Sequence, residues 1–299
     1  SPTAACAVRF MAAGRLGSMY TTRQVQSAID PDYVIEGAGV LLRRSIAPRA
    51  SNVFDPFLLF DHFAFNDPIE GPIRGFPMHP HRGIETVTYM LEGSTHHRDS
   101  LGNSGLIGPG DVQWMTSGRG ILHEEMPRRG PSGAIYGFQL WVNLPSRLKM
   151  TAPRYQEVSA DTIPTVEAPG LQVRVVAGTV QGVVGPVKDI AAAPLYLEAR
   201  LAPNTEFVHR VPAKHTALAY VFEGEAAFGD QNISAVRMVR FGPGEQISAR
   251  TSQTGVRFML IAGLPFEEPI APYGPFVMNT QEEIRQALVE LRNGTFIRE

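Results

Sequence analysis

The sequence predicts an all-β protein made of two tandem β-barrels, with one helix near the C-terminus. Three observations lead to this fold class: short apolar segments separated by turn-forming residues, an internal repeat, and a helical pattern late in the chain. At 299 residues the chain is about twice as long as a typical domain. Two domains, each with its own hydrophobic core, therefore fit its length.

Turn-forming residues punctuate the whole chain, because its 29 Gly and 24 Pro are spread rather than clustered. Between them lie short segments rich in β-branched and aromatic residues, with partial alternation of apolar and polar positions. The clearest of these segments are residues 83–91, 135–142, 171–177, 195–201 and 256–262. Many short strands of this kind are typical of a β-barrel or a β-sandwich.

One pattern occurs twice, once in each half of the chain. Residues 89–93 (YMLEG) are followed by residues 107–111 (IGPGD), and residues 220–224 (YVFEG) are followed by residues 241–245 (FGPGE). A strand followed by a turn would explain either copy alone, but it would not explain the similar spacing of both. We therefore interpret the two halves as a duplicated barrel.

A helix is predicted shortly before the C-terminus. Thr280 and Glu283 have the spacing of a capping box, in which each side chain accepts a hydrogen bond from the backbone N–H of the other residue. Apolar residues then recur at helical spacing until Gly294, a residue that commonly ends helices. We expect the apolar face, formed by Ile284, Ala287, Leu288 and Leu291, to pack against the barrels.

These observations divide the chain into four parts. Residues 19–150 form an N-terminal barrel that carries the metal site described below, and the polar, proline-bounded residues 151–170 form a linker. Residues 171–299 form a C-terminal barrel without a metal site, which ends in the helix. Residues 1–18 are interpreted as a disordered leader or cloning remnant; a targeting peptide is the rival interpretation, since this segment holds arginines and no acid.

Composition excludes several classes of protein. Hydrophobic residues make up 43% and charged residues 19% of the chain, as in globular proteins, and the apolar runs are far shorter than the ~20 residues of a membrane helix. The 27 basic and 29 acidic residues produce no global field that would attract nucleic acid. Cys6 is the one cysteine, so a disulfide framework and a thiolate metal site are both excluded.

Two short elements contain residues typical of a metal site. His79 and His81 lie two positions apart, as do His123 and Glu125, and such pairs share one face of an extended strand. If the two elements lie side by side inside a barrel, three imidazoles and one carboxylate converge and leave coordination positions open. This ligand set suits iron or another first-row divalent metal better than a closed structural zinc site.

The identity of the carboxylate ligand is open at this point. Glu85 competes with Glu125, because it lies four residues after His81 and would share the same strand face. Glu124 is a poorer candidate, since it alternates to the face opposite His123. A lone H-x-H element is also more often a pair of solvated histidines than a ligand pair, so the prediction depends on three of the eight histidines falling in these two elements.

The remaining histidines are assigned no chemistry. His96 and His97 follow a Glu-Gly turn and are interpreted as loop residues, and the others are interpreted as structural or surface residues: His62, His209 and His215. When the two repeats are aligned on their glycines, Arg210, Pro212 and Thr216 stand where His79, His81 and Glu85 stand in the first half. The second barrel is therefore predicted to have lost the metal ligands.

The sequence resembles the pirin family. Matching stretches extend over most of the chain from residue 42 to residue 291, and the two metal motifs with their flanks are the most specific of them. They are residues 42–46 (LRRSI), 55–61 (DPFLLFD), 79–83 (HPHRG), 110–115 (GDVQWM), 118–127 (GRGILHEEMP) and 274–280 (GPFVMNT). The sequence departs from the family pattern at His62 and Glu124, neither of which is a matched ligand.

The resemblance implies two cupin domains, which are jelly-roll-like barrels, with iron in the N-terminal one. It assigns the ligands to His79, His81, His123 and Glu125, and leaves Glu85 as a neighbour inside the barrel. Family members include enzymes similar to quercetin 2,3-dioxygenases and eukaryotic proteins that act as iron-dependent transcriptional co-regulators.

Two functions follow as hypotheses. In the first, which we favour, the chain oxidatively cleaves a flavonol such as quercetin with O2, and Glu125 is the catalytic base that takes the proton of the 3-hydroxyl. In the second, the metal's oxidation state controls binding of a protein partner. We expect a monomer in the cytoplasm, or also in the nucleus if the source is eukaryotic, with no membrane or direct nucleic-acid partner.

Overall fold

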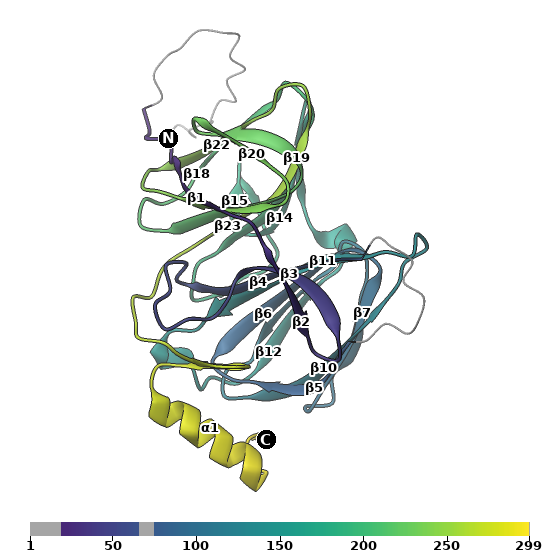
Figure 1. Cartoon of the computed structure of the whole chain (residues 1–299), viewed down its shortest axis with the longest axis vertical. Helices are drawn as coiled ribbons and strands as arrows, with labels where there is room; N and C mark the ends of the chain where they lie inside the picture. The colour runs from purple at the N-terminus through teal and green to yellow at the C-terminus, as the bar shows by residue number, and fades with distance from the viewer. Residues whose placement is uncertain (1–18, 66–74, 299) are drawn as a thin grey trace, which may run out of the picture.

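The computed structural model describes residues 19–65 and 75–298. It consists of two β-rich bodies stacked along the long axis, with a single helix beyond the first body (Figure 1). The predicted class, mostly strands with one α-helix near the C-terminus, is confirmed for the described residues. The interpretation of residues 1–18 concerns a segment outside the described residues. None of the described helices is long and apolar enough to cross a membrane.

The first body contains two antiparallel sheets. The larger has seven strands, in the order β12 (Arg154–Val158), β9 (Val112–Thr116), β6 (Ile84–Glu92), β11 (Ile135–Asn143), β4 (Phe57–Phe65), β3 (Val40–Ile46) and β2 (Asp32–Glu36). The smaller has four, in the order β5 (Phe76–His81), β10 (Ile121–Arg128), β7 (Ser94–Asp99) and β8 (Ser104–Ile107). Both candidate metal-binding elements belong to the smaller sheet.

The second body is one ten-stranded sheet. Its main path runs through β1 (Val25–Ile29), β21 (Arg237–Phe241), β19 (Thr216–Phe228), β23 (Val256–Gly263), β17 (Leu195–Leu201), β14 (Leu171–Ala177) and β13 (Thr165–Ala168). Off this path lie β18 (Glu206–Arg210), β20 (Gln231–Ser234) and β22 (Gln246–Arg250). Smaller elements complete the chain: β15 (Thr179–Val180), β16 (Val183–Val184), β24 (Ala271–Tyr273), β25 (Phe276–Met278), η1 (Ser146–Leu148), η2 (Ala160–Thr162) and α1 (Gln281–Asn293).

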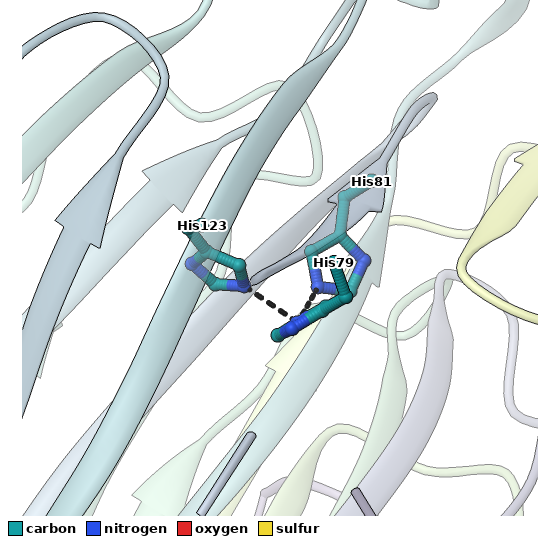
Figure 2. A group of neighbouring side chains, drawn as sticks. All are labelled: His79, His81 and His123. Carbon is teal, nitrogen blue, oxygen red and sulfur yellow. Dashed lines mark hydrogen bonds between the residues drawn. The ribbon is translucent and has the colours of Figure 1, made fainter. Parts of the chain in front are cut away.

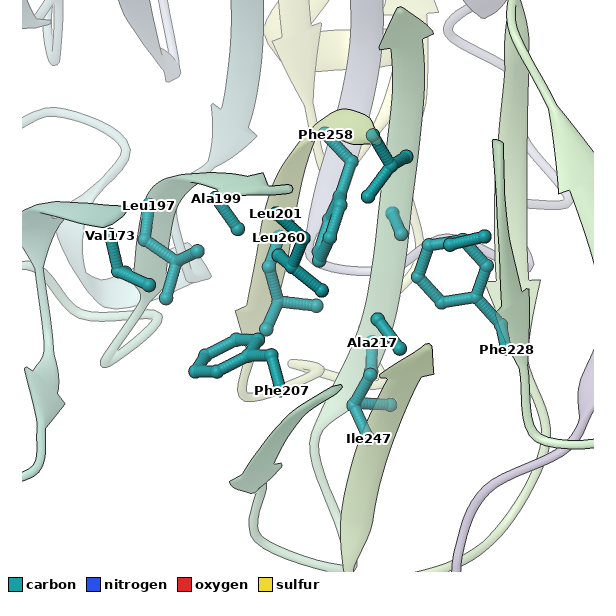
Figure 3. Close-up of a cluster of buried hydrophobic side chains, with 14 of the residues drawn as sticks. Val173, Leu197, Ala199, Leu201, Phe207, Ala217, Phe228, Ile247, Phe258 and Leu260 are labelled. Atoms are coloured by element: carbon teal, nitrogen blue, oxygen red, sulfur yellow. The ribbon is translucent and has the colours of Figure 1, made fainter. Parts of the chain in front are cut away.

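The interior of the second body is filled with apolar side chains (Figure 3). Phe207 on β18 and Ile247 on β22 both point into this cluster and are at most 2% exposed. The antiparallel pair β18 and β22 corresponds to the antiparallel pair β5 and β10 of the first body. In each body the first strand of the pair directly precedes the strand that carries the repeated tyrosine, β19 or β6. The positions aligned with His79 and His81 hold Arg210, which is exposed, and Pro212, and neither is a metal ligand.

The repeated tyrosines bind the two bodies together. Tyr89 on β6 and Tyr220 on β19 have no exposed surface and belong to one apolar cluster that draws residues from both bodies. Each repeat then ends at a glycine, Gly93 or Gly224, with a φ of 71°. A Cβ at Gly224 would lie 1.9 Å from the carbonyl oxygen of Gly255, so only glycine fits there.

Two segments lie in places other than those expected. Strand β1, predicted in the N-terminal barrel, pairs with β21 of the second body. Strand β12, within the predicted linker at 151–170, pairs with β9 of the first body. The division into domains stays a prediction, but the linker is not a free connection. Apolar alternation predicts a strand without saying which open sheet edge it joins, so these pairings were not predictable.

Helix α1 begins and ends as predicted. The Thr280 side chain accepts a hydrogen bond from the Glu283 backbone N–H, and Gly294 adopts the left-handed conformation with a φ of 72°. Ile284 and Ala287 are buried against the β24–β25 hairpin and Phe296. The helix covers the end of the first body that is farthest from the second (Figure 1).

The burial of His62 is expected to make the stability of the protein depend on pH. His62 Nδ1 lies 2.7 Å from Tyr220 Oη, and the His62 side chain is 1% exposed. Burial, and secondarily the charge of Arg43, lowers the pKa of His62 to about 3. Between pH 6.5 and that value the unfolded chain binds a proton that the folded chain does not, so stability falls as the pH falls.

We therefore predict that His62→Asn flattens this pH dependence. Chemical denaturation at several pH values between 7 and 4 should measure this. As the pH falls, the free energy of unfolding of the native chain should decrease by up to about 1.4 kcal/mol per pH unit more than that of the variant. Parallel curves for the two proteins would mean that His62 takes up its proton equally in the folded and unfolded states.

Candidate metal centre

Three histidines converge on one point of the four-stranded sheet. His79 and His81 lie on β5, and His123 lies opposite His79 on the neighbouring strand β10. The Nε2 atom of His79 is 3.1 Å from that of His81 and 2.9 Å from that of His123 (Figure 2). All three ligand atoms lie within 4.8 Å of one another, so they could bind a single ion.

Hydrogen bonds to the other ring nitrogens prepare two of these imidazoles to bind a metal. His79 Nδ1 is 2.8 Å from the Pro77 carbonyl oxygen, and His81 Nδ1 is 3.3 Å from the Pro275 carbonyl oxygen. A carbonyl can only accept, so each Nδ1 carries the hydrogen and each Nε2 presents a lone pair. Pro275 lies between β24 and β25, so the C-terminal segment orients a residue of the first body.

Burial keeps the imidazoles of His81 and His123 neutral. His81 is 3% and His123 is 1% exposed. Burial, and then the neighbouring histidines, lowers the pKa of His81 well below its usual value and the pKa of His123 to about 3. A neutral imidazole is the form that binds a metal, and unprotonated nitrogens held this close together fit a cation between them.

Glu125 lies beside the histidines, whereas Glu124 does not. Glu125 is 5% exposed, and its Oε2 atom is 3.7 Å from His123 Nε2. Glu124 points to the other face of β10 and forms an ion pair with Arg98, with 2.9 Å between Oε1 and Nε. Strand alternation separates the two adjacent acids in the way that the sequence suggests.

The expectation that Glu85 lies beside the histidines inside the barrel is wrong. Along β6, Thr88 faces the same pocket as Glu125, and Glu85, three residues earlier, faces the opposite way. Its partner on β11 is Val142, which belongs to the apolar cluster between the two bodies.

A turn explains why the spacing between His81 and Glu85 gave a wrong prediction. Gly83, with a φ of 83°, breaks the chain between β5 and β6, and these strands belong to different sheets. The i, i+4 rule for one strand face therefore does not extend from His81 to Glu85. Glu85 instead accepts a hydrogen bond of 2.6 Å from Thr116, and burial raises its pKa to about 7.

The interpretation of His96 and His97 as loop residues is also wrong. Both lie on β7, and His97 is 3% exposed and lies opposite Glu125 on β10. His97 Nε2 is 2.8 Å from Glu157 Oε1 on β12. Residues 94–99 follow the turn at Gly93 and alternate between buried and more exposed positions, which is the pattern of a strand.

A pocket opens beside Glu125. Its volume is about 380 Å³ including its mouth, and its walls are mainly apolar, with Phe63, Phe76 and Ile135 among them. Glu125 and Gln139 are polar groups in this lining. Glu125 therefore lies between the histidine cluster and a mainly apolar pocket.

Gln139 is a site residue that the sequence did not reveal. Its Nε2 atom donates to Glu125 Oε1 over 3.1 Å, and its Oε1 atom accepts from Trp141 Nε1 over 3.3 Å. The available signal was a polar residue at an alternate position of the apolar strand β11. Gln139 orients the Glu125 carboxylate.

Comparison with known proteins agrees with the fold. A family model described as Pirin matches residues 39–142, and one described as Pirin C-terminal cupin domain matches residues 196–297. The chain belongs to the pirin family. The two bodies are accordingly cupin domains, as expected from the sequence resemblance.

Relatives of this pirin-family chain come from bacteria, plants and animals. A pirin-like protein of Caulobacter vibrioides is 44% identical over 87% of this chain and 94% of its own length, and human pirin is 42% identical over 86% and 88%. The crystal structure of a quercetin 2,3-dioxygenase from Acinetobacter baumannii is 32% identical, with a TM-score of 0.83 over 92% of this chain and 99% of that one.

The position of Gln139 in this pirin-family chain leads to a prediction. Gln139→Leu should weaken metal binding about 10–100-fold, because the Glu125 carboxylate loses the donor that orients it. Titration of the metal-free protein with ferrous iron would measure this loss. Gln113→Leu is the matched control, since Gln113 is equally a strand residue, 2% exposed, but donates to Glu157 instead. Equal losses in the two variants would assign the effect to packing.

Proposed function

We propose that this chain is a dioxygenase that binds one iron ion through His79, His81, His123 and Glu125 and cleaves a flavonol such as quercetin with O2. The observation that carries the proposal is the position of Glu125, which borders both the histidine cluster and the apolar pocket. A group bound in the pocket would meet the metal centre at this carboxylate.

The donor set fits iron. Three imidazoles and one carboxylate leave positions open on a six-coordinate metal, and mixed nitrogen and oxygen ligands suit iron and its first-row neighbours. When bound, such an ion supplies Lewis acidity and one-electron redox chemistry. The described chain supplies the matching lone pairs at the Nε2 atoms of His79 and His81, since each Nδ1 faces a carbonyl.

The protein groups have separate tasks in this proposal. Glu125 accepts the proton of the flavonol 3-hydroxyl, and Gln139 holds the carboxylate in place through its hydrogen bond of 3.1 Å. The apolar walls bury the aromatic rings and exclude water from the reacting carbons. Overall, one flavonol and one O2 give one ring-opened ester and one carbon monoxide, so the atoms balance without another oxidant.

The likeness to the Acinetobacter baumannii protein supports this substrate class, because that structure is named a quercetin 2,3-dioxygenase and is 32% identical. Fold likeness alone would not support it, since one fold hosts many reactions.

The proposal is tested by the requirement for the 3-hydroxyl. Iron-loaded protein should consume O2 with a flavonol but not with the corresponding flavone, which lacks the proton that Glu125 takes. Equal oxygen uptake with both compounds would contradict the proposed role of Glu125. If the iron-loaded protein is inert toward flavonols, the alternative function, redox-controlled binding of a protein partner, becomes the better hypothesis, and partner capture by ferrous and ferric protein should then differ.

A further inference from the structure

A second pocket lies in the second body, away from the metal centre. It is formed by Arg23 and Gln26 at the start of β1, the turn between β18 and β19, and the end of β21, and its volume is about 480 Å³ including its mouth. Four of its lining side chains are basic and none is acidic: Arg23, Lys214, His215 and Arg240. The chain as a whole carries a net charge of −2, so this local excess of positive charge is not a property of the composition.

The charges in this pocket are not neutralised within the described part of the chain. Among residues 19–65 and 75–298, Arg23, Lys214 and Arg240 take part in no ion pair within 4.0 Å. Like charges gathered in a concave site repel one another and raise the local concentration of anions.

The nearest acids on the same loops are turned to other partners. The Asp55 carboxylate accepts hydrogen bonds from the backbone N–H groups of Phe266 and Glu267. The Glu245 carboxylate accepts one from the Thr21 backbone N–H. Neither side chain lines the pocket.

Arg23 is held ready for an anion. Its side chain is 3% exposed, and three backbone carbonyl oxygens fix it: Nε donates to Gly244 over 3.1 Å, and one terminal nitrogen donates to Pro212 over 2.8 Å and to Ala213 over 3.4 Å. The other terminal nitrogen, Nη1, has no hydrogen-bond partner among the described residues. A guanidinium fixed in this way loses little side-chain entropy when an anion binds.

His215 is a further hydrogen-bond donor in the lining of this pocket. Burial, and then the charge of Arg23, lowers the pKa of His215. A neutral His215 can still donate one N–H to an anion. Val53, which is 55% exposed, gives the pocket an apolar wall beside the cationic groups.

We propose that this pocket binds a small phosphate-class dianion, either inorganic phosphate or the phosphate group of a monoester. Arg240 presents a planar set of N–H donors, which suits phosphate oxygens, Arg23 adds its Nη1 group, and Lys214 adds a mobile charge at the mouth. The site gives the second cupin domain a ligand of its own and is independent of the metal centre.

Calorimetric titration of the full chain at low ionic strength tests this proposal. Inorganic phosphate should bind with one saturable site per chain, and Lys214→Gln and Arg240→Gln should each weaken that binding about tenfold. Lys188→Gln is the matched control, because Lys188 is equally exposed but lies outside the pocket, and it should leave the affinity unchanged. Phenyl phosphate should bind more tightly than inorganic phosphate if the physiological ligand is an ester.

Three results would overturn the proposal: no saturable phosphate binding, equal weakening by Lys188→Gln and Lys214→Gln, or loss of phosphate binding in His123→Ala protein. The last of these would place the phosphate on the metal. Because the pocket variants should keep the metal content of the native chain, failure here leaves the proposed dioxygenase function untouched.

Discussion

Replacing Glu125 with alanine is expected to abolish most metal binding and flavonol cleavage together, by more than about 100-fold, since loss of a ligand should exceed the usual effect of an outer partner. The physical reason is that Glu125 lies 3.7 Å from His123 Nε2 and is the one carboxylate that borders both the histidines and the pocket in the described chain. Metal content by elemental analysis and turnover by oxygen uptake would measure the two losses.

The neighbouring acid is the natural control. Glu124→Ala should keep both metal and activity, because Glu124 faces away from His123 and pairs with Arg98 on the outside of the sheet. Glu85→Gln should also keep the metal, because Glu85 faces the core between the two domains. Losses in Glu124→Ala as large as those in Glu125→Ala would contradict the assignment of the ligand.

The second large effect concerns the C-terminal helix. Arg82 directly follows His81, is 1% exposed, and forms an ion pair of 2.5 Å with Glu290 on α1. Hydrogen bonds from Gln286, Arg82 and Arg298 outweigh the opposing effect of burial and lower the pKa of Glu290. Glu290→Gln should therefore destabilise the protein by about 3 kcal/mol, since it leaves a buried guanidinium without its counter-charge.

Glu282→Gln on the same helix is the matched comparison. Its ion pair with Arg285 is solvent-exposed, with both side chains at least 69% accessible, and pairs of this kind contribute about 0–1 kcal/mol. Denaturant titration of both variants at neutral pH measures the difference. Similar destabilisation of the two would mean that the Arg82 pair adds no more than a surface pair.

Patterns among residues close in the sequence correctly predicted which face of a strand a side chain occupies and where the helix begins and ends. Strand alternation separates Glu125 from Glu124, and the capping residues Thr280 and Gly294 bound the helix as expected. The sequence also placed His79, His81 and His123 in two elements that now lie side by side.

Contacts between distant segments could not be predicted. The Pro275 carbonyl beside His81, the ion pair between Arg82 and Glu290, and the pairing of β1 with the second domain join segments about 200 residues apart, and no periodicity encodes them. Gln139 was missed because its partner, Glu125, lies on another sheet. Glu85 was misplaced because the turn at Gly83 carries the chain from one sheet to another.

The most direct test of the proposed function measures carbon monoxide released and O2 consumed by iron-loaded protein with quercetin. We predict one carbon monoxide per O2, with activity absent from His79→Ala and His123→Ala proteins that remain folded by circular dichroism. Cleavage that persists in those variants, or that free iron at the same concentration matches, would contradict the account, because the reaction would then not require the centre formed by His79, His81, His123 and Glu125.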